Sequence, residues 1–258
     1  MIETVHSETR GTTLLITITR EEKRNALDIG TISEIARLIN GVGSEVRAVV
    51  LTAAGDHFSA GLDLYELVDG TAWDTVQSSR NWHEYMNQIQ FGPVPVISAL
   101  HGAVIGGGLE LAASTHIRVA DSTAYYALPE AARGLYVGGG GSARLPKLIS
   151  LARMTDMMLT GRVLTAEEGH AAGLSQYLVA TGKALETALE LAEAVARNTK
   201  LTNFAVNHVL PRINDSSQEV GLLTESLMAA LAKTDPQAQE RLAEFLDGRS
   251  ARVRPTNA

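Results

Sequence analysis

The alternation of apolar and polar residues predicts several strands in the first half of the chain. Residues 12–20 (TTLLITITR) alternate around β-branched side chains, which is typical of a half-buried strand. Residues 46–52, 94–100 and 117–120 are short apolar runs, the pattern that buried strands of a parallel sheet prefer. We therefore expect a largely parallel sheet.

Helical spacing of apolar residues lies between these strands. Ile32, Ile35, Ala36 and Ile39 share one helix face within residues 29–39. Residues 66–90 are helical in pattern but interrupted by a glycine and polar positions, so we expect a mobile or ligand-facing helix there. A further helix is expected over residues 109–114, directly after a glycine run. Strands alternating with helices predict an α/β fold.

The pattern changes near residue 195 from mixed α/β to helix only. Helices are predicted over residues 184–199, 201–210, 217–233 and 237–247, and a shorter one before Gly173. We expect a core of residues 1–195 and a C-terminal helical region of residues 196–258. The helical region is expected to dock on its own core or on a neighbouring subunit.

Composition excludes several classes of function. The 258 residues carry a formal net charge of −7, which disfavours binding to nucleic acid or to anionic lipid. The absence of cysteine excludes disulfides, thiolate nucleophiles and thiolate zinc sites. The first ten residues have neither signal-peptide nor transit-peptide character, and residues 93–114 contain too many prolines, glycines and charges for a membrane span. A cytoplasmic location and no membrane association are expected.

Three glycine-bearing segments are the main candidates for a site: residues 58–64 (FSAGLDL), 102–112 (GAVIGGGLELA) and 128–145 (LPEAARGLYVGGGGSARL). Glycine runs that lead into helices leave backbone N–H groups free to stabilise an anion or a developing oxyanion. The dinucleotide and Walker A patterns do not fit, and the serine-hydrolase elbow fails at Arg144. No H-E-x-x-H pattern is present, so no metal is expected.

Two carboxylates adjoin these segments. Glu110 lies in the first turn of the helix after Gly108, where the helix dipole and nearby N–H groups are expected to favour its ionised form. Glu130 follows Pro129 in an apolar stretch, where the pKa of a carboxyl group tends to rise. Taken singly, each has an ordinary explanation, Glu110 as a helix stabiliser and Glu130 as an exposed turn residue.

Taken together, these motifs resemble the crotonase (enoyl-CoA hydratase/isomerase) superfamily over nearly the whole chain. FSAGLDL resembles the family's A-G-x-D-[IL] loop, and residues 95–112 (PVISALHGAVIGGGLELA) resemble its P-V-I-A-x-x-x-G-x-x-x-G-G-G-x-E-L motif. LPEAARGLYVGGGGSARL resembles its P-E-x-x-x-G-x-x-P-G-x-G-G-x-x-R-L segment. The resemblance implies a spiral of ββα units, followed by a helical region that forms homotrimers or dimers of trimers.

The resemblance also implies a set of site residues. The backbone N–H groups of Leu62 and Gly107 would form an oxyanion hole for a thioester carbonyl, worth roughly 3 kcal/mol per donor. The substrate is expected to be an acyl-CoA thioester, with no separate cofactor because coenzyme A is part of the substrate. Further contacts to the substrate or its coenzyme A are expected from Ala60, Gly61, Asp63, Gly106, Gly138, Lys23 and Arg24.

Glutamates at both positions imply hydration of a 2-enoyl-CoA. Glu110 would act as general base on water and Glu130 would deliver a proton to the α-carbon of the enolate. Alternatives are isomerisation, decarboxylation or C–C hydrolysis of an acyl-CoA, and a non-catalytic member that only binds a partner. A glycoside-hydrolase interpretation of the two carboxylates leaves the glycine-built oxyanion hole without a purpose.

The chain departs from the family pattern beside Glu130. Val137 stands where the family has proline, and Leu128 stands where a glutamine often precedes Pro-Glu.

Aromatic residues of the interrupted helical segment bear on the size of the acyl group. Trp73, Trp82 and Tyr85 are expected either to line a pocket for a bulky acyl chain or simply to pack on one helix face.

Overall fold

The computed structural model describes residues 4–64 and 70–249. The chain falls into two compact units, Met1–Ala196 and Arg197–Ala258. The first unit contains both sheets and the candidate site residues, whereas the described part of the second contains helices and the turns that connect them. Within the described ranges, no helix combines the length and apolar character needed to cross a lipid bilayer.

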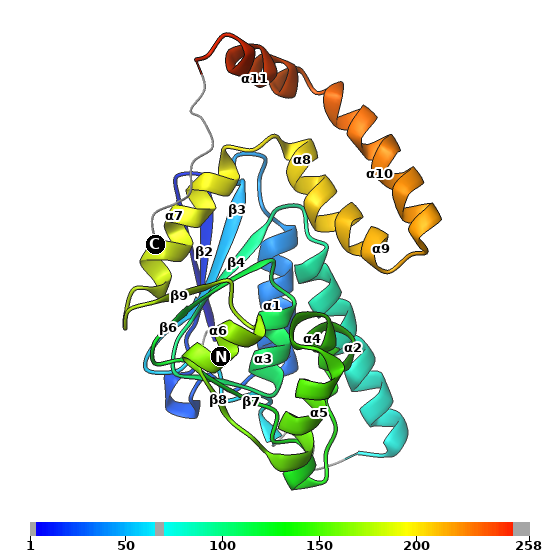
Figure 1. The fold of residues 1–258 in the computed structure, drawn as a ribbon. Helices are drawn as coiled ribbons and strands as arrows, with labels where there is room; N and C mark the ends of the chain where they lie inside the picture. Colours follow the sequence, from blue (N-terminus) through cyan, green and yellow to red (C-terminus); the bar gives the residue numbers. More distant parts are fainter. Residues whose placement is uncertain (1–3, 65–69, 250–258) are drawn as a thin grey trace. The chain divides into compact units, whose positions relative to one another are not determined.

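The larger sheet of the first unit is almost entirely parallel (Figure 1). Only its edge strand β1 pairs antiparallel, with β2, while β2, β3, β4, β6 and β9 follow one another in parallel. The strands, in spatial order, are β1 (Val5–Arg10), β2 (Thr13–Ile18), β3 (Ala48–Ala53), β4 (Val96–Leu100), β6 (Ile117–Asp121) and β9 (Tyr177–Val179). The predicted parallel sheet is therefore confirmed.

A second, three-stranded sheet lies in the same unit. It consists of β5 (Ala103–Ile105), β7 (Tyr125–Ala127) and β8 (Leu164–Thr165), with β5 and β7 parallel and β8 antiparallel. Each strand has only two or three residues, too few for a periodic pattern, which is why the sequence did not reveal them. Strand β7 ends just before Pro129 and Glu130, and β5 ends just before Gly106.

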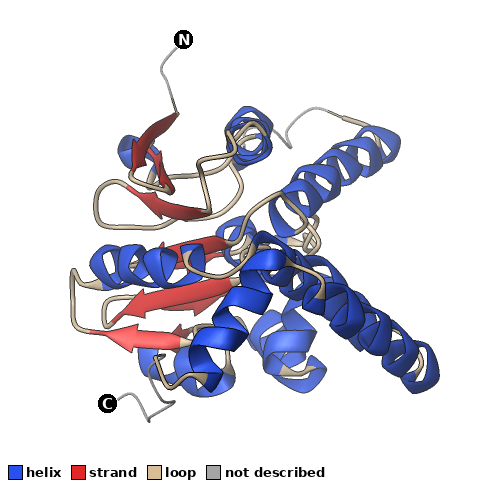
Figure 2. Ribbon diagram, turned by 90° about the horizontal axis from the view of Figure 1, so that it is seen from above, coloured by secondary structure: helices blue, strands red, loops and turns tan. Residues whose placement is uncertain are grey.

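Both faces of the larger sheet are covered, as parallel sheets require. Successive residues of β3 point to opposite sides: Ala48 and Val50 pack with α7 (Ala184–Ala196), whereas Val49 and Leu51 belong to the main core. That core also holds the buried faces of α1 (Ile29–Asn40), α2 (Ala72–Gln90) and α3 (Gly107–Ala113). Figure 2 shows helices on either side of the strands.

Short helical elements complete the first unit. They are η1 (Glu21–Lys23), η3 (Ala131–Arg133), α4 (Gly141–Ile149), α5 (Leu151–Thr160) and α6 (Ala166–Ala172), which ends at Gly173 as predicted. The side chain of Asp28 caps α1, and Thr71 with Asp74 forms a capping box at the start of α2. The predicted helix over residues 66–90 thus begins at residue 72, and residues 65–69 lie outside the described residues.

The second unit consists of consecutive helices. They are α8 (Lys200–Phe204), the π-helical turn η4 (Ala205–Val209), α9 (Leu210–Asn214), α10 (Gln218–Lys233) and α11 (Pro236–Leu246). The helix predicted over residues 201–210 is helical, but its second half is a π-turn that leads into Pro211. Many large apolar side chains of this unit are exposed, including Val220, Leu223, Leu227 and Leu231 of α10.

Candidate active site

A cavity of about 560 Å³ lies in the first unit between α2, the start of α3 and the loops that follow β5 and β7. Of the residues selected from the sequence, it is lined by Ala60, Gly61, Leu62, Gly106, Gly107, Glu110, Glu130 and Gly138. These positions span almost 80 residues of sequence. The fold therefore brings all three glycine-bearing segments to one cavity.

The backbone N–H groups of Leu62 and Gly107 lie next to each other at this cavity. A Cβ atom added to Gly107 would lie 3.2 Å from the nitrogen of Leu62. Within the part of the chain that the structure describes, neither N–H donates to an acceptor. Gly107 is the first residue of α3, and near Leu62 the backbone hydrogen bonds are made by the neighbouring residues. Two adjacent free donors of this kind can bind a carbonyl oxygen that gains negative charge.

The loop that carries Leu62 is held rigidly. The backbone of Ser59 pairs with Ala103 and Ile105, and its side-chain oxygen accepts a hydrogen bond from the N–H of Gly61 at 3.1 Å. Gly61 has φ +100°, and a Cβ atom there would lie 2.9 Å from the carbonyl oxygen of Ile105. Glycine is thus required at position 61 for the close approach that sets the two donors side by side.

Glu110 points from α3 into a nest of backbone donors. Its Oε1 accepts hydrogen bonds from the N–H groups of Gly139 at 2.9 Å and Gly141 at 2.7 Å. Burial raises the pKa of Glu110 above its ordinary value, although the two N–H groups and the guanidinium of Arg144 oppose the rise. The sequence-based expectation that helix position would favour the ionised form is therefore wrong in its net direction, because the side chain is only 4% exposed and desolvation dominates.

Glu130 faces the same cavity from the turn after β7. Its Oε2 is buried and has no hydrogen-bond partner within the described residues. Burial raises the pKa of Glu130 to about 7, and the negative charge of Glu110 adds to the rise. The predicted rise is confirmed, and a carboxyl group with such a pKa keeps its proton for part of the time near neutral pH.

The two carboxyl groups thus differ in their partners. Glu110 has N–H donors that stabilise a negative charge, whereas Glu130 has a buried oxygen without a hydrogen-bond partner among the described residues. A pair in which one member is ionised and the other protonated can act as base and acid at the same time. The adjacent N–H groups of Leu62 and Gly107 provide a third function, the stabilisation of an oxyanion.

Three residues selected from the sequence do not line the cavity. Asp63 is buried and bound by the Arg20 guanidinium at 2.9 Å and by the Lys23 ammonium at 2.8 Å. Arg24 donates to the hydroxyl of Tyr125 at 3.2 Å. In this structure Asp63 therefore anchors the loop beside Leu62 to η1.

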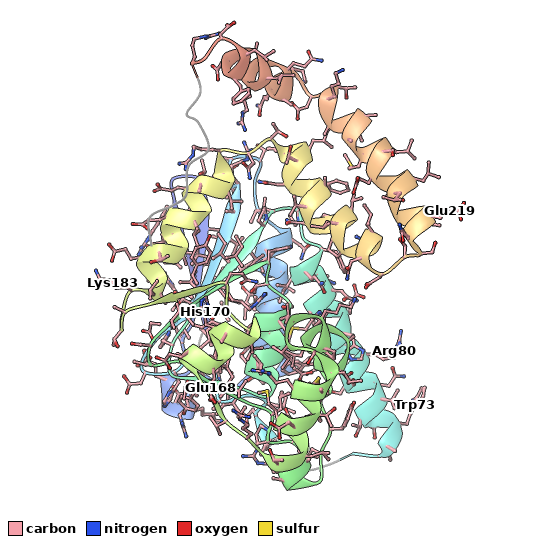
Figure 3. All side chains as sticks on the ribbon, viewed as in Figure 1. Trp73, Arg80, Glu168, His170, Lys183 and Glu219 are labelled. Atoms are coloured by element: carbon pink, nitrogen blue, oxygen red, sulfur yellow. The ribbon has the colours of Figure 1, made fainter. Side chains whose placement is uncertain are left out.

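The structure also shows where the three aromatic residues and Leu128 lie. Of the three aromatic residues proposed for the acyl pocket, Trp82 lines the cavity, Tyr85 packs against the main core, and Trp73 is 66% exposed and points away from the body of the unit (Figure 3). Leu128 is fully buried in the core and provides no hydrogen-bond donor to Glu130.

Further cavity residues were missed by the sequence analysis. Ser79 and His83 reach the cavity from α2, one helical turn apart, and Leu135 and Tyr136 reach it from the loop after η3. Arg144 stabilises the glycine loop of the site, because it donates hydrogen bonds to the carbonyl of Gly139 at 3.2 Å and to the side chain of Gln90 at 2.7 Å. The spacing of Ser79 and His83 was visible, but a polar pair at i and i+4 on a helix is usually a solvated face.

Within residues 4–64 and 70–249, no three His, Asp or Glu side chains are grouped so that they would hold a metal ion.

Comparisons with known proteins agree with this arrangement. The model of the enoyl-CoA hydratase/isomerase family matches residues 8–252. The chain is 34% identical to enoyl-CoA hydratase EchA19 of Mycobacterium tuberculosis over 214 residues, covering 81% of this chain and 79% of that protein. These shares show the likeness to extend over most of both proteins.

Solved structures are similar along nearly the whole chain. A protein of Rhodopseudomonas palustris, described as a candidate enoyl-CoA hydratase, has a TM-score of 0.93 and 52% identity and covers 95% of each chain. An enoyl-CoA hydratase of Bacillus anthracis has a TM-score of 0.88 and 27% identity, covering 96% of this chain and 97% of the other. With its parallel sheet, paired backbone donors and facing carboxyl groups, the chain belongs to the enoyl-CoA hydratase/isomerase family of the crotonase superfamily.

Proposed function

We propose that the protein is an enoyl-CoA hydratase that adds water across the 2,3 double bond of a 2-enoyl-CoA. The observation that supports this most is the presence of two unlike carboxyl groups on one cavity, Glu110 held by two N–H donors and Glu130 with a buried, unpartnered oxygen. Hydration requires a base for water and an acid for the α-carbon, which these two groups supply.

The reaction follows from the placement of the donors. The N–H groups of Leu62 and Gly107 receive the thioester oxygen, which makes the β-carbon electrophilic and stabilises the enolate. Ionised Glu110 takes a proton from water as the water oxygen bonds to the β-carbon. Protonated Glu130 gives its proton to the α-carbon, and transfer of the proton from Glu110 back to Glu130 restores both groups.

The lining of the cavity favours an apolar acyl group. Leu64, Val76, Trp82, Leu135 and Val137 form its apolar wall. In this proposal the chain of the substrate lies against Trp82, and the loop of Ala60 and Gly61 contacts the coenzyme A portion. Lys23 in η1 and Arg24 at the end of η1 would contact a phosphate of coenzyme A. The ammonium group of Lys23 would then contact both this phosphate and Asp63.

A related reaction within the family is the second candidate. The side chain of Leu128 cannot form a hydrogen bond with Glu130, so the carboxyl group of Glu130 is less firmly oriented than it would be beside a glutamine. Isomerisation, decarboxylation or C–C hydrolysis uses the same oxyanion donors with a different proton route. Product analysis by mass spectrometry and NMR separates these reactions. Isomerisation leaves the mass of the thioester unchanged and decarboxylation removes carbon dioxide. Hydration and C–C hydrolysis both consume one water, but only hydration leaves the carbon skeleton intact.

The proposed function is tested by the absorbance of the conjugated thioester. Purified protein is mixed with crotonyl-CoA and then with longer and aromatic 2-enoyl-CoAs. Hydration is supported if the absorbance falls with the unaltered protein but not with Glu110→Gln, and if that variant still binds the thioester. Full activity in a variant with both Glu110→Gln and Glu130→Gln contradicts the assignment.

We also propose that the second unit mediates self-association into a homotrimer or a dimer of trimers. Val220, Leu223, Leu227 and Leu231 are at least half exposed and recur every three or four residues along α10. Apolar side chains at this spacing form a continuous stripe on one helix face. A second copy of the chain that covers the stripe would remove it from water.

A further inference from the structure

Helix α2 contacts the glycine loop of residues 138–141 through the hydroxyl group of Ser79. The Ser79 hydroxyl donates a hydrogen bond to the carbonyl oxygen of Gly138 at 2.6 Å. The Nε2 of His83, one turn further along α2, lies 3.4 Å from the same hydroxyl oxygen. The hydroxyl is thus directed across to the loop, although a helical serine often bonds back to its own helix.

The carbonyl of Gly138 and the N–H of Gly139 belong to one peptide group. This group is planar and rigid, so fixing the direction of its carbonyl also fixes the direction of its N–H. The N–H of Gly139 donates to Oε1 of Glu110 at 2.9 Å. A single peptide plane therefore has Ser79 at one end and Glu110 at the other.

The loop cannot be held by side chains of its own. A Cβ atom on Gly139 would lie 3.2 Å from the carboxyl carbon of Glu110 and 3.3 Å from Trp82, and one on Gly141 would lie 2.9 Å from Cγ of Glu110. Glycine is needed where the backbone approaches the carboxylate this closely, but a run of glycines loses much conformational freedom on ordering. Contacts from outside the loop must therefore set its conformation.

We propose that Ser79 is a positioning residue for Glu110, acting through the peptide group between Gly138 and Gly139. Arg144 holds the next carbonyl of the loop, that of Gly139, at 3.2 Å. Ser79 and Arg144 thus fix successive peptide groups from opposite elements, α2 and α4. The activity assay of this proposal rests on the proposed hydration, but the titration described below does not.

The variant Ser79→Ala removes the donor to Gly138 and leaves the rest of α2 in place. The peptide group then rotates more freely, and the hydrogen bond from Gly139 to Glu110 is made for less of the time. Loss of about one such bond is expected to lower kcat for hydration about tenfold, with little change in KM. A merely structural defect in the pocket wall would instead raise KM.

The pH profile gives a more specific readout. A weaker N–H bond makes Glu110 harder to ionise, so the acidic limb of the profile moves upward by about half a pH unit in Ser79→Ala. The other titratable or charged groups around this site, among the described residues, are Glu130 after β7, Arg133 of η3, Arg144 on α4, and Arg80 and His83 on α2. Because His83 contacts Ser79, the shift is also measured in a His83→Gln background, where it is expected to persist.

Two further variants complete the experiment. Ser79→Thr keeps the hydroxyl and is expected to retain most of the activity and the native pH profile. Ser33→Ala is the matched control, because Ser33 is also a helical serine bonded to a backbone carbonyl but lies outside the cavity. It is expected to leave kcat, KM and the pH profile unchanged.

Titration of the Glu110 carboxyl group by NMR of carbon-13-labelled protein needs no substrate. An upward shift in Ser79→Ala, with none in Ser33→Ala, supports the positioning role whichever reaction the enzyme performs. An unchanged titration, or an equal shift in Ser79→Thr, overturns it. Lack of turnover by the unaltered protein with every 2-enoyl-CoA, by contrast, overturns the proposed hydration alone.

Discussion

Gly106 and Glu130 approach so closely that a Cβ atom on Gly106 would lie 2.7 Å from Oε1 of the glutamate. Gly106 also has φ +50° and ψ −120°, a conformation that is costly for any residue with a side chain. The pair joins the N-terminus of α3, where the oxyanion donor Gly107 lies, to the proposed proton donor. Glycine at this position therefore serves both the backbone conformation and the placement of the carboxyl group.

Replacement of Gly106 by alanine is expected to displace Glu130. We expect the Gly106→Ala variant to lose about 2 kcal/mol of unfolding free energy and about a hundredfold in kcat. Gly134→Ala is the matched control, because Gly134 also has a positive φ, +70°, and follows η3, but has nothing within 4 Å of an added Cβ. Chemical denaturation and steady-state kinetics check both. Equal losses of kcat in the two variants would contradict a specific role for the contact between Gly106 and Glu130.

The variant Glu110→Gln is expected to remove the general base while it keeps the shape of the side chain. We expect kcat for hydration to fall by roughly a thousandfold, with binding of a saturated acyl-CoA little changed, because the N–H groups of Leu62 and Gly107 remain. Isothermal titration calorimetry and the absorbance assay measure the two quantities. Glu186→Gln removes a charge of the same type from an exposed ion pair with Lys183 and serves as the control. Retention of kcat in Glu110→Gln would show that another group activates water.

We expect kcat/KM to decrease as the pH rises, with a midpoint near pH 7. Glu130 must carry a proton to act as an acid, and burial raises its pKa to about 7, so the protonated fraction falls as the pH rises through that value. In Glu130→Gln this alkaline limb is expected to disappear from the residual activity. An identical limb in the variant would assign it to a different group.

The raised pKa of Glu130 also predicts a pH-dependent effect on stability. Its value rises from 4.5 to about 7 on folding, so the folded state binds the proton more tightly and stability is lost as the pH increases from about 4.5 to about 7. Glu130→Gln removes this penalty. Because the group is partly solvated, we expect a gain on the order of 1 kcal/mol at pH 8.5 and almost none at pH 4. Thermal unfolding at the two pH values measures this, and an equal gain at both would point to packing instead.

Charge introduced into the apolar stripe of α10 is expected to weaken self-association. Each leucine that a partner covers contributes about 2 kcal/mol, so the double variant Leu223→Glu with Leu227→Glu is expected to dissociate to monomers at micromolar concentration. Sedimentation velocity measures the assembly state. The control is Gln218→Glu, which adds negative charge to the same helix outside the stripe. A monomeric unaltered protein would contradict the proposed assembly.

Much of the fold and the proposed site could be predicted from local sequence. The apolar run of β3 and the periodic apolar face of α1 are properties of adjacent residues, and they lie in the structure within two residues of their predicted bounds. The glycines before α3 and α4 likewise mark backbone turns that only glycine adopts easily. Glu110 and Glu130 were noticed because they adjoin such turns, whereas Leu62 and Gly107 were singled out by the resemblance to the crotonase family, and all four line one cavity.

Tertiary structure alone decided the chemical environment of these residues. The N–H donors to Glu110 lie 29 and 31 positions further along the chain, and Ser79 reaches the same loop from α2. Asp63 meets Lys23 rather than the cavity because two loops far apart in sequence pack together. The pKa of Glu110 rises although its place in a first helical turn predicts the opposite. Burial by the folded chain determines that pKa, and burial results from contacts between distant segments that no local pattern encodes.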